Sequence, residues 1–252
     1  MTISEKTWEE YIADLRKVNE TAADKFKKYL ETHSVETYED WQAAIEYGYA
    51  LATQYGEAAA ELACEMYDAM AELSGVMLPA AEPAATATIA ETAKTINGIR
   101  KYSDDVEMIA AGVGRLVKMA GVDTTMKNAL RDGAQWAWIP HGDTCAFCIA
   151  LASRGWQKAS KNAIKNGHAE HIHANCDCTY AIRFNERTEY EGYEPDRYKS
   201  MYNSTSGTPQ EKINAMRREF YAENKEKINE QKRSAYEKRR ERDSSSAEEL
   251  NI

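Results

Sequence analysis

The 252-residue sequence has little of what membrane-spanning and exported proteins carry. No stretch approaches the roughly 20 apolar residues that a helix needs to cross a bilayer, and the first six residues contain no basic leader followed by an apolar run. We therefore expect no membrane partner and a protein that is made and folded in a bacterial cytoplasm. The formal net charge of −9 excludes the overall basic surface of a freely diffusing nucleic-acid-binding protein. Any contact with DNA must be local.

Prolines are scarce as well, and two of the five, Pro79 and Pro83, fall in one short segment. A proline removes a backbone donor and biases the residue before it away from the helical region. We expect a hinge or linker over 75–83.

Apolar residues at steps of three and four predict helices on both sides of this segment. The first two cover about 4–32 and 37–73, and Gly48 and Gly56 are the weak points of the second. Three more follow, and Ser103 and Asp123 are candidate N-caps. These three helices are expected over 86–97, 103–119 and 123–136.

Short alternating patterns typical of strands appear at 136–140 and 176–184 and predict a small hairpin or ribbon. The stretch after Phe184 is tyrosine-rich and irregular and is expected to be a loop. The predicted fold is mainly α, with a small zinc-stabilised α+β module in the C-terminal half. The expected segments are a helical arm (1–78), a second helical segment (84–136), the zinc-binding module (137–185), and a loop with a basic C-terminal helix (186–252).

Four of the five cysteines lie in two tight clusters, while Cys64 stands apart as a small buried side chain. A reducing cytoplasm favours metal ligands over disulfides. Thiolates and imidazoles in two closely spaced groups are typical of a tetrahedral zinc site. Two ligand sets remain open: two cysteines, His173 and one or both of the last two cysteines, or all four cysteines without His173. The candidate ligands are Cys145, Cys148, His173, Cys176 and Cys178.

We expect the zinc to be structural. The module is a segment of about 45 residues with few large apolar side chains, so the ion is expected to supply folding free energy outright. Trp136, Trp138 and Trp156 are predicted to form core around the metal and not a stacking platform for bases.

Catalytic alternatives are weaker. A zinc deaminase would use an H-x-E such as His168-Ala169-Glu170, but its Cys-x-x-Cys pair would follow this motif instead of preceding it. A zinc-stabilised nuclease that cuts DNA with His171 and His173 is the main alternative. We expect no enzyme, no small-molecule substrate and no catalytic residue.

A polar helical pattern from 209 to 242 ends in a local excess of basic residues. In an acidic protein this is the most suitable place for DNA or an acidic partner to bind. The candidate nucleic-acid-binding residues are Lys232, Arg233, Lys238, Arg239, Arg240 and Arg242.

Two runs around the cysteines, 138–155 and 173–179, resemble the phage Mu protein F-like minor head protein family. The first contains Asp-x-Cys-x-x-Cys after a tryptophan-led strand, and the second reads H-x-N-C-x-C-T. The matching residues are Asp143, Cys145, Cys148, His173, Asn175, Cys176, Cys178 and Thr179.

The resemblance implies a head-morphogenesis protein of a tailed phage or prophage, located in the virion at the portal vertex or inside the capsid. Its implied partners are the portal protein, the major capsid or scaffold protein, and packaged DNA. A host-side regulatory or toxin-associated zinc module remains an alternative.

Overall fold

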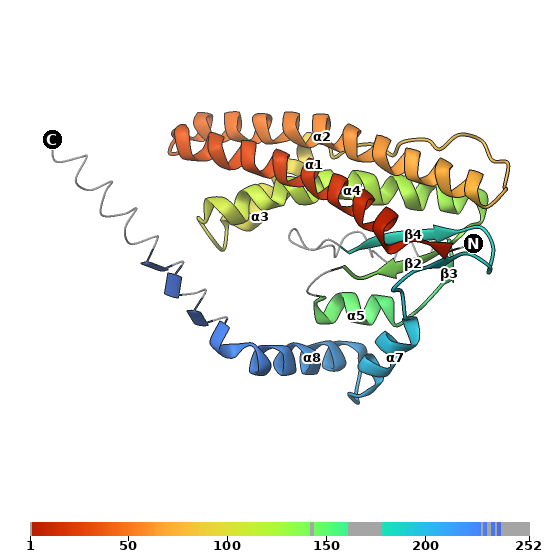
Figure 1. The fold of residues 1–252 in the computed structure, drawn as a ribbon. Coiled ribbons are helices and arrows are strands. Elements are labelled where there is room, and N and C mark those ends of the chain that lie inside the picture. Colours follow the sequence, from red (N-terminus) through yellow and green to blue (C-terminus); the bar gives the residue numbers. More distant parts are fainter. Residues whose placement is uncertain are drawn as a thin grey trace.

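The structure, a computed structural model, describes residues 2–141, 144–160, 178–227, 229–230, 233–234 and 236–237. Figure 1 shows three long helices, α1, α2 and α4, that form a layer above a small sheet. Helices α5, α7 and α8 lie on the other side of that sheet. The prediction of a mainly α fold is confirmed.

The first two helices are α1 (Glu5–Thr32) and α2 (Tyr38–Leu73), and both were predicted closely from apolar spacing. The backbone N–H of Thr7 donates to the Ser4 side chain at the start of α1. A capping box between Thr37 and Asp40 begins α2. These caps satisfy the first amide groups of each helix, so the chain enters both helices without loss of hydrogen bonds.

Where three short helices were expected, the structure has two: α3 (Ile89–Arg100) and a long α4 (Val106–Asp132). The predicted N-cap at Asp123 is wrong because Asp123 lies inside α4, and the N-cap of that helix is Asp105, not Ser103. The sequence between the two expected helices contains no proline, so nothing interrupts the hydrogen bonds there.

Helix α4 is buried on nearly all sides because three of its glycines face three other helices. A Cβ at Gly112 would lie 2.7 Å from the Ile99 side chain of α3, and one at Gly114 would lie 3.0 Å from the Asn19 carbonyl oxygen of α1. A Cβ at Gly121 would lie 3.0 Å from the Ala59 carbonyl oxygen of α2. The missing side chains let the four helices approach closely around α4.

The proline-containing segment joins α2 to α3, as predicted for a linker, and it is hydrogen-bonded to α4. Asn128 of α4 accepts a hydrogen bond from the Glu82 N–H at 3.0 Å and donates to the Glu82 carbonyl at 2.9 Å. The Ala84 N–H donates to Thr124 Oγ1 at 2.9 Å. The guanidinium of Arg131 donates to the carbonyl oxygens of Pro79 and Ala80. Side chains of α4 therefore form hydrogen bonds with backbone groups of this extended, proline-containing segment.

Replacing Asn128 with leucine is expected to lower the free energy of unfolding by about 2–3 kcal/mol. The side chain is fully buried, and the change leaves backbone groups of Glu82 without their partners. Urea unfolding followed by circular dichroism measures the loss. The exposed Asn203 provides the control: its change to leucine should cost less than about 0.5 kcal/mol. Equal losses for the two variants would contradict the anchoring role of Asn128.

The sheet has the strand order β3-β2-β4, with β2 (Gln135–Ile139) in the centre. It pairs antiparallel with β3 (Gln157–Lys158) and with β4 (Thr179–Arg183), so both predicted strands are present and adjacent. Trp136 lies opposite Ile182, and Trp138 lies opposite Tyr180. A short helix, α5 (Ala146–Ala152), follows β2 in the chain.

The sheet is not an isolated module. Its buried side chains belong to the same hydrophobic core as those of α1, α2 and α4. Trp136, Trp138 and Tyr180 are almost fully buried, with ring centroids of each tryptophan within 5 Å of the tyrosine ring. The described strands of this segment therefore also gain stability from packing against the helices.

A second, two-stranded sheet was not predicted. The first residues of the chain, β1 (Thr2–Ile3), pair in parallel with β5 (Glu189–Tyr190). Trp8 of α1 packs edge-on against Tyr190, with ring centroids 5.1 Å apart. The Tyr190 hydroxyl donates to the Ile182 carbonyl at 2.8 Å, which links this pair to the larger sheet.

The chain beyond β5 forms α7 (Pro195–Asn203) and α8 (Pro209–Glu223). Part of the stretch that was expected to be a loop is therefore helical. Helix α8 contacts α5 through a small separate cluster of Met216 with Ala146 and Ile149. None of the described helices combines the length and apolar character needed to span a membrane.

Candidate metal centre

Three of the five candidate zinc ligands lie in described parts of the chain, near one end of the larger sheet. Cys145 is the N-cap of α5, and Cys148 follows in its first turn. Cys178 immediately precedes β4, next to the point where Thr179 pairs with Ile139 of β2. Cys148 and Cys178 are each 1% exposed. The two halves of the cysteine motif, at the start of α5 and just before β4, therefore lie on elements that adjoin the central strand β2.

The turn after β2 contacts one of these sulfurs directly. The backbone N–H of His141 donates to Cys178 Sγ, with 3.4 Å between the nitrogen and the sulfur. The Cys178 thiol in turn donates to the His141 carbonyl oxygen, with 3.9 Å between the sulfur and the oxygen. This contact suits a ligand, and it equally suits a buried thiol that closes a turn.

The described residues alone do not form a metal site. Among them, no three His, Cys, Asp or Glu side chains lie close enough together to hold an ion. No disulfide joins Cys145, Cys148 and Cys178 to one another. The other two candidate ligands, His173 and Cys176, lie outside the described residues, as does His171 of the nuclease alternative. The zinc site thus remains a prediction.

The tryptophans near the cysteines form core, as predicted. Trp136 and Trp138 are each 1% exposed. Trp156 is half-buried between Tyr190 and Tyr193. The Arg183 guanidinium stacks over the Trp156 ring, 4.6 Å from the ring centroid. Their faces are occupied by protein, so they offer no platform for stacking nucleic-acid bases.

The predicted nucleic-acid-binding residues lie mostly beyond the described part of the tail. Arg233 is described and exposed. The remaining ones, which lie outside the described residues, are Lys232, Lys238, Arg239, Arg240 and Arg242.

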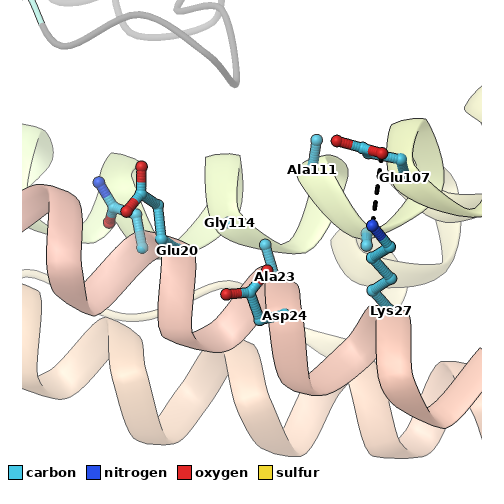
Figure 2. A pocket seen from close by; sticks show the side chains of 9 residues that line it. Glu20, Ala23, Asp24, Lys27, Glu107, Ala111 and Gly114 are labelled. Atoms are coloured by element: carbon cyan, nitrogen blue, oxygen red, sulfur yellow. Dashed lines mark hydrogen bonds and ion pairs between the residues drawn. The ribbon is translucent and has the colours of Figure 1, made fainter. Parts of the chain in front are cut away.

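A small acidic notch between α1 and α4 was not predicted. Figure 2 shows Lys27 of α1 reaching toward Glu107 of α4, with Glu20 and Asp24 further along α1. The Lys27 Nζ and Glu107 Oε2 atoms are 3.4 Å apart. The notch has a volume of about 260 Å³. Its carboxylates come from surface positions of two amphipathic helices, which a sequence pattern does not distinguish from an ordinary solvated face.

A larger feature, also missed, is a groove of about 1020 Å³ between α3 and α4. We call it the α3–α4 groove. Its walls are largely apolar, and three carboxylates, those of Asp123, Glu91 and Glu107, line it as well. Burial raises the pKa of Asp123 from 3.8 to about 6, and the nearby Glu91 charge adds to the shift.

The Asp123 carboxyl predicts a specific dependence of stability on pH. Because its folded pKa is raised, the folded state keeps a proton that the unfolded state has lost between about pH 4 and pH 6. The free energy of unfolding therefore falls as pH rises through this window, by about 2–3 kcal/mol in total. We expect Asp123→Asn to be more stable than the parent protein at pH 7.5, with the difference vanishing near pH 4. Urea titrations at several pH values measure it, and a constant difference would contradict the assignment.

Comparison with known proteins gives one match. The family model described as VG15 protein matches residues 2–205, which include both helical segments, the sheet and the described cysteines. No curated protein and no solved structure matches the sequence. The match indicates a viral protein of phage type and is coarser than the resemblance to Mu protein F-like proteins. Because it covers most of the sequence, the chain belongs to the VG15 protein family.

Proposed function

We propose that this protein is a minor head protein of a tailed phage or prophage, acting by docking in the virion and not as an enzyme. The family match supports a phage protein. The observation that carries the finer proposal is the arrangement of the cysteine motif. Its tryptophan-led strand β2, the helix α5 that begins at the Cys-x-x-Cys pair, and the strand β4 after Cys178 lie side by side in one unit.

The surface supports a docking role. Several large apolar side chains are well exposed at separate places, including Tyr38 at the start of α2, Tyr102 after α3 and Phe220 in α8. Aromatic side chains supply much of the energy at protein interfaces. The partners that fit the proposal are the portal protein and the major capsid or scaffold protein, with packaged DNA as a partner of the basic tail.

Co-purification tests the assembly role. The protein is expressed with a tagged portal protein encoded by the same phage genome, and it is also sought in purified particles by mass spectrometry. Retention on the portal and presence in particles are expected. Particles that contain portal but lack this protein would overturn the proposal.

We further propose that Cys145 and Cys148 bind a structural Zn²⁺ together with two of His173, Cys176 and Cys178. The burial of two of these thiols and their position at one end of the sheet support this assignment. When bound, the ion would join the start of α5 to the start of β4. The long helices α1, α2 and α4 also contact one another directly.

Protein purified under reducing conditions is expected to contain about one zinc per chain by elemental analysis. A chelator should then lower the melting temperature but leave most of the helical circular dichroism, because α1, α2 and α4 also pack directly on one another. Cys148→Ser should lose the metal, whereas the control Cys64→Ser should keep it. A zinc-free protein, or equal metal content in the two variants, would refute the site.

A further inference from the structure

The α3–α4 groove has the size and the lining of a site for a helix. Ala111, Arg115, Met119 and Asp123 follow one another at four-residue steps along α4 and form its floor. Helix α3 and the segment before it form the walls. The apolar members of the lining include Ala85, Ala87, Ile99, Met108, Leu116 and Ala120.

One wall of the groove has space that no side chain fills. Gly98 of α3 lines the groove, and a Cβ placed there would have no atom within 4 Å. This differs from Gly112 on the floor, where a Cβ would already touch Ile99. The groove is therefore open along α3.

Of the three carboxylates that line the groove, only that of Asp123 is partly buried, whereas Glu91 and Glu107 are exposed. The Asp123 carboxylate is largely removed from water, and no hydrogen bond from the described residues reaches it. Burying a carboxylate without a partner is costly, so a cationic group of a ligand would be favoured beside it. The other charged residues on the lining are Glu91, Glu107, Lys94 and Arg115.

The second half of α8 has the complementary surface. Residues 217–223 are all exposed, whereas Met216 just before them is buried against α5. Arg217, Phe220 and Tyr221 stand three and four positions apart and so share one face of the helix. Phe220 is 49% exposed and Tyr221 is 42% exposed. We call this face the α8 stripe.

We propose that the α8 stripe of one molecule docks in the α3–α4 groove of a second copy of this chain. Phe220 and Tyr221 would enter the apolar groove, and the Arg217 guanidinium would meet the Asp123 carboxylate. An amphipathic helix that lays its apolar face in a groove is a common mode of recognition. The charge complementarity between the arginine and the carboxylate selects this chain's own helix as the occupant.

The position of α8 requires the groove of another molecule. Helix α8 is held to α5 by Met216, on the side of the sheet away from the layer of α1, α2 and α4 (Figure 1). The stripe and the groove are different surfaces, so their contact is heterologous. Such a contact can close as a reciprocal pair or a larger ring, or it can continue as an open chain.

Sedimentation velocity over a concentration series tests the proposal on the full chain. The mean mass of the parent protein should rise with concentration. Gly98→Phe blocks the groove by filling open space, and Phe220→Glu removes the stripe. Each variant alone should associate at least about tenfold more weakly than the parent (about 1.4 kcal/mol by the tenfold relation). The controls Gly98→Ala and Phe220→Leu should associate like the parent, and circular dichroism should show that all four variants are folded.

Mixing the two blocked variants gives the decisive measurement. The intact stripe of Gly98→Phe can enter the intact groove of Phe220→Glu, so the mixture should form dimers and nothing larger. Asp123→Asn should weaken association of the parent protein while leaving its fold intact. A parent protein that stays monomeric, or a mixture that stays monomeric, would overturn the proposal. Unchanged association of the blocked variants would show that another surface makes the contact and would overturn it as well.

Discussion

A leucine at Gly121 is expected to destabilise the protein by about 3 kcal/mol or more. The Cβ alone would stand 3.0 Å from the Ala59 carbonyl oxygen and 3.6 Å from the Leu15 side chain. The α2 neighbour is backbone and cannot rotate away, and the Leu15 side chain of α1 is buried in the core. The rest of the leucine side chain would force α4 apart from both helices. Urea unfolding followed by circular dichroism, or loss of soluble protein where the variant fails to fold, measures the effect.

Gly98 provides a matched control because it is also a helical glycine. The same change to leucine there meets open space, so we expect a change within about 1 kcal/mol, with stabilisation favoured by the higher helix propensity of leucine. Similar destabilisation of both variants would mean that backbone flexibility, and not helix contact, explains the glycine in α4.

The second large effect is expected at Trp138, whose change to alanine should cost about 3–5 kcal/mol. The indole is 1% exposed and packs edge-on against Tyr180, with the ring centroids 4.7 Å apart. Because the two residues lie directly opposite each other on β2 and β4, the cavity would open between paired strands. Both the sheet and the helical layer that covers it would lose contacts.

Phenylalanine at the same position separates packing from hydrogen bonding. The Trp138 indole N–H is buried, and no described residue accepts a hydrogen bond from it. Trp138→Phe should therefore keep most of the ring contact and lose no polar interaction, so its cost should be less than half that of alanine. A phenylalanine variant as unstable as the alanine variant would contradict this account of the site.

Local patterns predicted the helices and the two main strands well. Apolar residues at steps of three and four located α1 and α2 nearly to the residue. The strands at the cysteine motif were equally clear, because their alternation of large and small residues has the period of a strand. These features depend on neighbours in the sequence.

The errors came from contacts between distant parts of the chain. Helix α4 continues through Asp123 because α1, α2 and α3 surround it, and an acidic residue within such a helix resembles an N-cap when only the sequence is read. The hydrogen bonds that hold the linker to α4 could not be predicted because its partners, Asn128 and Thr124, are 46 and 40 residues away in the sequence.

The same reason explains what was missed at the candidate sites. The α3–α4 groove exists because α3 and α4 stand apart in the fold. The presence of Gly98 in the sequence does not predict this separation. The stripe on α8 did have a signal, since Arg217, Phe220 and Tyr221 repeat at helical spacing in a polar helix. The cysteine motif was the easiest to find because candidate metal ligands only a few positions apart can be recognised in the sequence alone.

The parallel pairing of β1 with β5 constrains how the protein is made on the ribosome. Ile3 is synthesised long before its partner Tyr190. At roughly 5–20 residues per second, the first strand waits about 10 seconds or more for that partner. During this time Trp8 lacks the tyrosine ring against which it packs in the finished protein. The N-terminal end of α1 can reach its final packing only after nearly the whole sheet region has been translated.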